Sequence, residues 1–124
     1  MILVISHLAD IFRDSLIDYI ASISISNGLG SPEEYTIYIN KTERVDDTWI
    51  VVMNVQYPSL TFNNSPVMEY IEDIGLLQLK KDIKSYSMEK MNDYIKKHGL
   101  NMEYDIDTHK DMLNFDIYLK IRFL

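Results

Sequence analysis

The C-terminal stretch of the chain alternates between large apolar and polar side chains. Every second residue from Leu113 to Phe123 is apolar, and polar residues such as Asp116 and Lys120 lie between them. A period of two is that of a β-strand, whose successive side chains point to opposite faces. The pattern therefore predicts a long closing strand with one face on the core and the other toward water or a partner.

Three earlier segments show the same period of two, at residues 33–40, 47–57 and 102–107. The apolar face of the second segment carries Trp49, Val51, Met53 and Val55. Its other face is also apolar at Ile50 and Val52 and turns polar only at Asn54. The first two segments are joined by the polar connection "KTERVDD", and two adjacent strands joined in this way predict a β-hairpin.

Apolar residues recur at steps of three and four between Ile5 and Ile23, which predicts an amphipathic helix. The next residues, "SNGLGSP", supply two glycines and a proline that end the helix and begin a loop. Ser65 and Pro66 fit the cap and the first position of another helix.

Three residues predict how this second helical region is divided. Gly75 predicts a break or kink, Ser87 fits the cap of a further helix, and Gly99 fits a left-handed C-terminal cap. The full order is then α-β-β-α-α-β-β over a single domain of residues 1–124. We expect an α+β fold in which helices cover one face of an antiparallel sheet of about four strands.

Composition and charge exclude several classes of function. The chain has a formal net charge of −7, which opposes binding to a phosphate backbone because no counterion release would drive it. It has no cysteine, which excludes disulfides, thiolate metal sites and cysteine nucleophiles. The start "MILVISHLADIF" lacks a basic region and a cleavage site, so we expect no secretion signal, no membrane span and a soluble protein that stays in the cell.

The sequence offers little chemistry. "GLGSPE" lacks the third glycine of a dinucleotide loop and the lysine of a P-loop, and no serine lies in a nucleophile-elbow sequence. In "DIDTHKD", the side chains of Asp105, Asp107 and His109, followed by Asp111, could hold a divalent ion. A solvated turn is the simpler explanation of these residues, because polar residues collect in turns whatever the function, so we expect no catalytic residue, no metal and no cofactor.

Tyrosines on the predicted outer side of the sheet are the strongest positive signal. Tyr38 and Tyr118 fall on the faces assigned to solvent, where Ile50 and Val52 add apolar surface. Such a patch suits contact with another protein. Trp49 lies on the core side, where packing and an interface anchor are both open interpretations.

The order of these segments resembles that of the tail-terminator, or tail-completion, proteins of long-tailed phages. The resemblance is carried by "SHLADIFRDSLIDYI", "EYTIYIN", "DDTWIVVMNVQYP", the helix after Pro66 and "DIDTHKDMLNFDIYLKIRF". It spans nearly the whole chain. It implies a virion protein, made in the host cytoplasm, that forms a ring, expected to be a hexamer, capping the tail tube and joining the head connector without catalysis.

The resemblance also implies which residues meet partners. Those on the outer sheet face, beside Tyr38, are Ile50, Val52 and Tyr118, which would meet other copies. Those in the first hairpin loop are Arg44, Asp46 and Asp47, which would face the tail or the connector. No specific nucleic-acid sequence and no membrane is implied.

A hypothesis from a different class is a small acidic inhibitor, such as an immunity or anti-defence protein. The charge of −7 suits it, because an acidic surface steers toward a basic site on an enzyme. Oligomeric state separates the two hypotheses, since a ring subunit self-associates whereas an inhibitor binds one target as a monomer or dimer.

Overall fold

The computed structural model describes residues 2–26, 36–56, 66–110 and 114–124. Two helices and four strands make up this part of the chain. In chain order they are α1 (Ile2–Ser26), β1 (Thr36–Val45), β2 (Thr48–Gln56), α3 (Pro66–Lys97), β3 (Met102–Lys110) and β4 (Asn114–Phe123).

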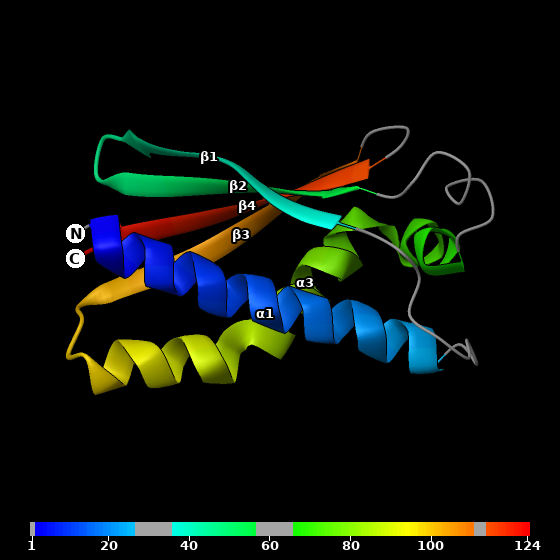
Figure 1. Cartoon of the computed structure of the whole chain (residues 1–124), viewed down its shortest axis with the longest axis horizontal. Coiled ribbons are helices and arrows are strands. Elements are labelled where there is room, and N and C mark those ends of the chain that lie inside the picture. Colours follow the sequence, from blue (N-terminus) through cyan, green and yellow to red (C-terminus); the bar gives the residue numbers. More distant parts are fainter. Residues whose placement is uncertain (1, 27–35, 57–65, 111–113) are drawn as a thin grey trace.

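The four strands form one antiparallel sheet in the order β1-β2-β4-β3. Two hairpins, β1–β2 and β3–β4, meet where β2 pairs with β4. Figure 1 shows α1 and α3 together on one side of the sheet, with the other side uncovered by helices. The predicted α+β fold, with helices on one face of a four-stranded antiparallel sheet, is confirmed.

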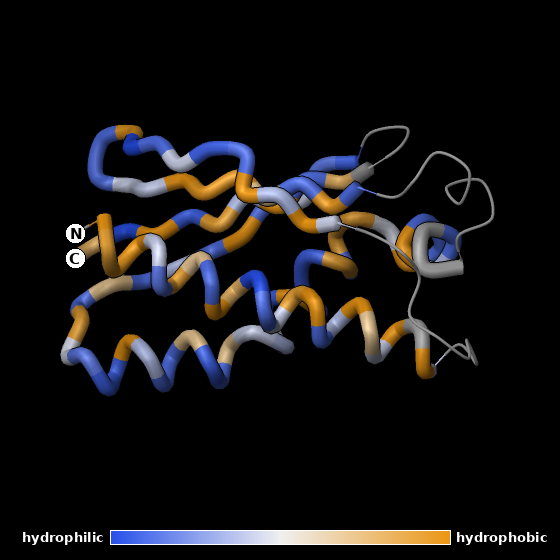
Figure 2. The backbone as a smooth tube through the Cα atoms, viewed as in Figure 1, coloured by the Kyte–Doolittle hydropathy of each residue, from blue (hydrophilic) through white to orange (hydrophobic). Residues whose placement is uncertain are grey.

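The core lies between the helices and the odd-numbered residues of β2 and β4. Side chains from the two central strands with no exposed surface are Val51, Met53, Val55, Phe115, Ile117, Leu119 and Ile121. From α1, the buried stripe includes Ile5, Leu8, Phe12 and Leu16. Figure 2 shows the same periodicity as hydrophobic positions that recur along α1. The alternation read from the sequence therefore sorts the side chains into a core face and an outer face, as predicted.

The second helical region, α3, is interrupted at Gly75, as predicted, and not at Ser87. Gly75 interrupts α3 with φ 81° and ψ 161°, a conformation that favours glycine. The predicted cap at Ser87 is wrong, because Ser87 lies inside α3 and its Oγ donates to the Lys84 carbonyl at 3.2 Å. That bond satisfies the hydroxyl within the helix, so no new start is needed.

The end of α3 is built as the sequence predicts. Gly99 has φ 60°, and Leu100 N–H donates to the Ile95 carbonyl at 3.0 Å while Gly99 N–H donates to the Lys96 carbonyl at 3.2 Å. These two bonds form a Schellman motif, which closes the helix through a left-handed glycine.

The first hairpin differs from the prediction in the length of its loop. β1 continues to Val45, so only Asp46 and Asp47 form the turn and Arg44 lies on the strand. A register shift between Ile39 and Lys41 marks a β-bulge. Because a bulge inserts one extra residue, it reverses the inward-outward alternation, which made the strand seem to end near residue 40.

Candidate interaction surface

The sheet face turned away from the helices, here called the outer face, includes four rows of side chains that cross all four strands. Strand register defines the rows as Tyr38-Asn54-Asp116-His109, Lys41-Val52-Tyr118-Asp107, Glu43-Ile50-Lys120-Asp105 and Val45-Thr48-Arg122-Glu103. Each row runs from β1 through β2 and β4 to β3. The structure thus brings the four predicted contact residues onto one face.

These four residues differ in accessibility. Tyr38 is 48% exposed, whereas Ile50 and Tyr118 are half-buried. Val52 is only 8% exposed, because it lies in the middle of a row between Lys41 and Tyr118. The expected open apolar patch is therefore smaller than predicted, and Val52 is not available for contact in this conformation.

Ion pairs surround the apolar centre of the outer face. Lys120 Nζ lies 2.9 Å from Asp107 Oδ2, and Arg122 Nη2 lies 2.7 Å from Glu103 Oε1. On β1, Lys41 Nζ lies 3.2 Å from Glu43 Oε2. Exposed pairs such as these contribute little stability individually. Their arrangement gives the face an apolar centre and a polar rim, which is the anatomy of many protein interfaces.

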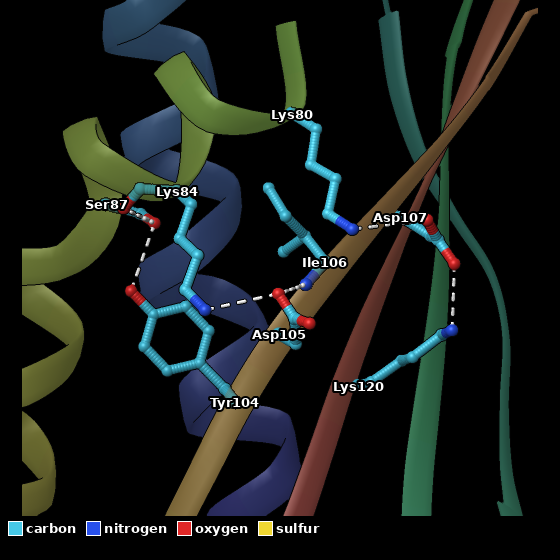
Figure 3. A network of polar contacts seen from close by, with 8 residues as sticks. All are labelled: Lys80, Lys84, Ser87, Tyr104, Asp105, Ile106, Asp107 and Lys120. Carbon is cyan, nitrogen blue, oxygen red and sulfur yellow. Dashed lines mark hydrogen bonds and ion pairs between the residues drawn. The ribbon is translucent and has the colours of Figure 1, made fainter. Parts of the chain in front are cut away.

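At the β3 edge of the sheet, two lysines of α3 contact carboxylates of the strand (Figure 3). Lys84 Nζ lies 3.2 Å from Asp105 Oδ1, and Lys80 Nζ lies 3.6 Å from Asp107 Oδ1. Thr108 Oγ1 also donates to the Leu76 carbonyl at 3.0 Å. Two lysine side chains and one backbone carbonyl of α3 thus tie this edge to the helix.

The lysines change the acidity of both carboxyl groups. Burial acts to raise the pKa of Asp105, but the Ile106 N–H and Lys84 outweigh it and leave the pKa lowered. The hydrogen bond from Lys120 is the main cause that lowers the pKa of Asp107. Sequence reasoning missed this network, although lysines one helical turn apart and carboxylates two strand positions apart are its signal.

These contacts also bear on the possible metal site in "DIDTHKD". Among the described residues, no group of three or more His, Asp or Glu side chains is placed to hold a metal ion. Asp105 and Asp107 contact lysines, and the His109 ring packs 4.7 Å from the Tyr118 ring, centroid to centroid. Asp111 lies outside the described residues.

The opposite edge of the sheet, at β1, is open. Within β1 only Ile37 is buried, and no described strand or helix lies beyond it in the sheet. A groove of about 190 Å³ runs between β1 and the start of α1, lined by Ile2, Ile5, Ser6, Ala9, Ile39 and Thr42. Exposed apolar side chains therefore flank an edge strand whose outward backbone groups lack a neighbouring strand.

The tip of the first hairpin is held by local bonds. Asp46 has φ 56°, as the primed turns of tight hairpins require at this position. Arg44 Nε donates to the Asp46 carbonyl at 3.0 Å, and Thr48 Oγ1 donates to Asp47 Oδ1 at 3.2 Å. Arg44 thus stabilises the turn, and the structure places Asp46 and Asp47 at an exposed acidic tip.

The Asn54 side chain on the outer face is buried with only part of its hydrogen-bonding capacity satisfied. Asn54 is 4% exposed and its Nδ2 donates to Asp116 Oδ1, while its Oδ1 is buried and has no hydrogen-bond partner among the described residues. Exchanging the amide oxygen and nitrogen would set an oxygen against the Asp116 carboxylate, so the observed orientation is the favourable one. The sequence placed Asn54 on the outer face but gave no sign that it is buried.

Neither of the described helices, α1 and α3, is long and apolar enough to cross a membrane. Comparisons of this chain with protein families, with curated proteins and with solved structures find no match.

Proposed function

We propose that this protein is a non-catalytic structural subunit that assembles with copies of itself through the outer face of its sheet. The observation that carries the proposal is the outer face, which the helices leave uncovered and which has a half-buried apolar centre within charged pairs. Helices occupy the other side of the sheet (Figure 1). The outer face is therefore the broad surface on which a second protein can lie.

The distribution of charge supports contact between copies at this face. The chain carries a net charge of −7, and copies should repel one another where that charge is concentrated. The outer face, however, has as many cations as carboxylates once the two lysines of α3 are included. The cations are Lys41, Lys80, Lys84, Lys120 and Arg122, and the carboxylates are Glu43, Glu103, Asp105, Asp107 and Asp116. Copies can meet there without adding to their mutual repulsion.

The resemblance to phage tail terminators gives this assembly a specific role. In that role six copies form a ring that caps the tail tube and joins it to the head connector in the virion. The acidic hairpin tip at Asp46 and Asp47 faces one of these partners, and Tyr38, Ile50 and Tyr118 face a neighbouring copy. The role requires no catalytic residue, cofactor or specific nucleic-acid sequence.

The proposal is tested by the variants Ile50→Lys and Tyr118→Lys. The new lysine lies between Glu43 and Lys120 in the first variant and beside Asp107 in the second. Both positions are partly exposed on the outer face, so each subunit should remain folded. Each variant should lose assembly because it replaces apolar contact surface with a charged side chain, which is costly to remove from water when a second copy covers it. Asn92→Lys adds the same charge on an exposed position of α3 and is the matched control.

Circular dichroism measures folding, and sedimentation velocity measures assembly. We expect both outer-face variants to be folded and to sediment more slowly than the control. If they assemble as the control does, the outer face is not the contact. In a phage that encodes this chain, the same variants should give tails of uncontrolled length or tails detached from heads.

The acidic-inhibitor hypothesis is favoured by a different surface. Asp10, Asp14 and Asp18 are exposed one turn apart on α1. Within the described part of the chain, only Asp18 of these three has an ion pair, with Oδ2 3.1 Å from Lys90 Nζ. This stripe could face a basic site. A chain that stays monomeric, and whose binding to a basic enzyme is lost in Asp10→Lys and Asp14→Lys, would select this function instead.

A further inference from the structure

The two edge strands of the sheet differ in their contacts: α3 packs against β3, whereas β1 is exposed. This difference suggests that β1 pairs with a partner strand. At β3, α3 supplies Lys80, Lys84 and a backbone carbonyl that engage the strand. At β1, nearly every side chain is exposed and no described element continues the sheet. Natural sheets protect their edges or use them for pairing, and this chain protects one edge with a helix.

We infer that β1 pairs antiparallel with β1 of a second copy, about a twofold axis that passes through Thr42. The two four-stranded sheets then become one continuous sheet with all helices on the same side. This inference goes beyond the proposed function, because it rests on the β1 edge and not on the outer face. Twofold pairing stops at two copies, so any larger assembly formed through the outer face would be built from such dimers.

The backbone groups of β1 point in the directions that a twofold axis at Thr42 requires. In a two-residue hairpin, the residues that flank the turn direct their backbone groups at each other, here Val45 and Thr48. Alternation along the strand then directs Glu43 to β2, while Thr42 and Arg44 direct their N–H and C=O groups to the open edge. Thr42 can therefore exchange two hydrogen bonds with the partner's Thr42 on the axis.

The side chains of β1 are complementary to themselves in this register. Lys41 lies opposite the partner's Glu43, and Glu43 lies opposite the partner's Lys41, all on the outer face. Once the bulge residue is passed over, exposed Tyr38 lies opposite the partner's Val45, which is 49% exposed in the single chain. Opposite charges and apolar pairs directly across antiparallel strands are both stabilising.

The groove beside β1 extends the contact to a second layer. Thr42, the residue on the axis, also lines the apolar groove between β1 and the first turns of α1. The twofold axis therefore brings the grooves of the two copies next to each other. Ile2 and Leu3, which are 67% and 65% exposed, lie at this end of α1 and would be covered by the partner's helix.

Charge exchange at Lys41 and Glu43 tests the pairing. Lys41→Glu places two carboxylates opposite each other twice in the dimer, and Glu43→Lys does the same with two ammonium groups. Each variant alone should associate at least about tenfold more weakly than the wild type. Mixed together, the two variants should form heterodimers, because every carboxylate at these two positions of one chain then lies opposite an ammonium group of the other.

Matched controls carry the same charge changes away from the axis, at the exposed positions Lys81→Glu and Glu89→Lys. These should associate as the wild type does. Circular dichroism should show every variant folded, because the Lys41–Glu43 pair within one chain is exposed and contributes little stability. Native mass spectrometry of the mixture, with one variant labelled by ¹⁵N, identifies the heterodimer directly.

A second measurement locates the axis. The chain has no cysteine, so Thr42→Cys introduces a single thiol. Paired residues on the axis have Cα atoms about 5.5 Å apart, within the range of a disulfide, and oxidation should give a covalent dimer. Thr36→Cys, exposed near the start of the same strand, should not crosslink.

The outcomes distinguish this inference from the proposed function. Weak self-association of both charge variants, recovery in their mixture and crosslinking at Thr42 establish the β1 pair, whatever Ile50→Lys and Tyr118→Lys do. If the charge variants associate as their controls do and Thr42→Cys does not crosslink, the β1 pairing is wrong. Loss of larger assemblies in the outer-face variants, with dimers retained, would concern the outer face alone.

Discussion

Tyr19 links the packing of the two helices to pH. It is 7% exposed on α1, and its hydroxyl donates to Asp82 Oδ2 of α3 at 3.4 Å. Burial and then the charge of Asp82 raise the pKa of Tyr19 well above its ordinary value near 10. The folded state therefore holds the tyrosine neutral at a pH where the unfolded chain releases its proton.

The consequence is a loss of stability at alkaline pH. A raised pKa in the folded state contributes stability that is fully present below about pH 10 and is lost as the pH rises beyond it. Tyr19→Phe removes the ionisable group, so its melting temperature should fall less than that of the wild type between about pH 9 and pH 11. At neutral pH it should cost only the lost hydrogen bond, about 0.5–1.5 kcal/mol. Parallel decreases in the two proteins would contradict the role of Tyr19.

Phe115 and Arg122 lie on opposite faces of β4 and should contribute unequally to the free energy of unfolding. Phe115 is fully buried, so Phe115→Ala should lower the free energy of unfolding by about 3–5 kcal/mol through lost burial and a cavity. Arg122 is exposed on the same strand, and Arg122→Ala should cost no more than about 1 kcal/mol. Urea denaturation of both variants checks the difference, and comparable losses would mean that the outer face is as closely packed as the core.

At the scale of elements, the network between α3 and β3 should make the edge sensitive to acid. Lowered pKa values for Asp105 and Asp107 mean that these carboxylates stabilise the fold above their ordinary values near 3.8. That contribution is lost as the pH falls through the lower folded values. Asp105→Asn combined with Asp107→Asn should therefore narrow the gap in stability between pH 7 and pH 3.

The expected change is small, because both carboxylates are substantially exposed and solvent screens their ion pairs. Thermal denaturation at the two pH values measures it. Asp10→Asn combined with Asp14→Asn makes the same chemical change on the exposed side of α1 and is the control. If the double variant at β3 loses as much stability in acid as the wild type, the lysine contacts do not contribute to stability.

The elements that the sequence predicts well are those with a long, uninterrupted period. α1 and β4 follow from spacing alone, because one face of each is buried against the core, whereas β2 follows from a largely apolar run that is buried on both faces. The kink at Gly75 and the cap at Gly99 follow from the conformations that only glycine adopts readily. In contrast, Ser87 was misplaced because serine can bond within a helix as well as begin one.

The features that the sequence does not predict depend on register between distant segments. The bulge near Lys41 follows from the register between β1 and β2. The burial of Val52 follows from its position between β1 and β4 in the sheet. Likewise, the contacts of Lys80 and Lys84 with β3 require the packing of α3 against that edge. Alternation assigns a residue to a face, but its exposure depends on neighbours across the sheet.

At the scale of the whole molecule, two surfaces are proposed as contacts between copies. The outer face is balanced in charge although the chain is acidic, and the β1 edge is open although the β3 edge is closed. Both features favour association between copies. In the described part of the chain, the remaining carboxylates lie on the helices and at the hairpin tip, where their charge would oppose contact between copies.

The most direct test of the central claim, that this chain assembles with copies of itself, is sedimentation equilibrium of the unmodified protein. One chain has a mass of 14.6 kDa. We predict masses that are even multiples of this value, with a dimer as the smallest assembled species. A single species of 14.6 kDa at every concentration up to about 100 µM, where contacts of micromolar Kd are populated, would contradict self-assembly through either surface.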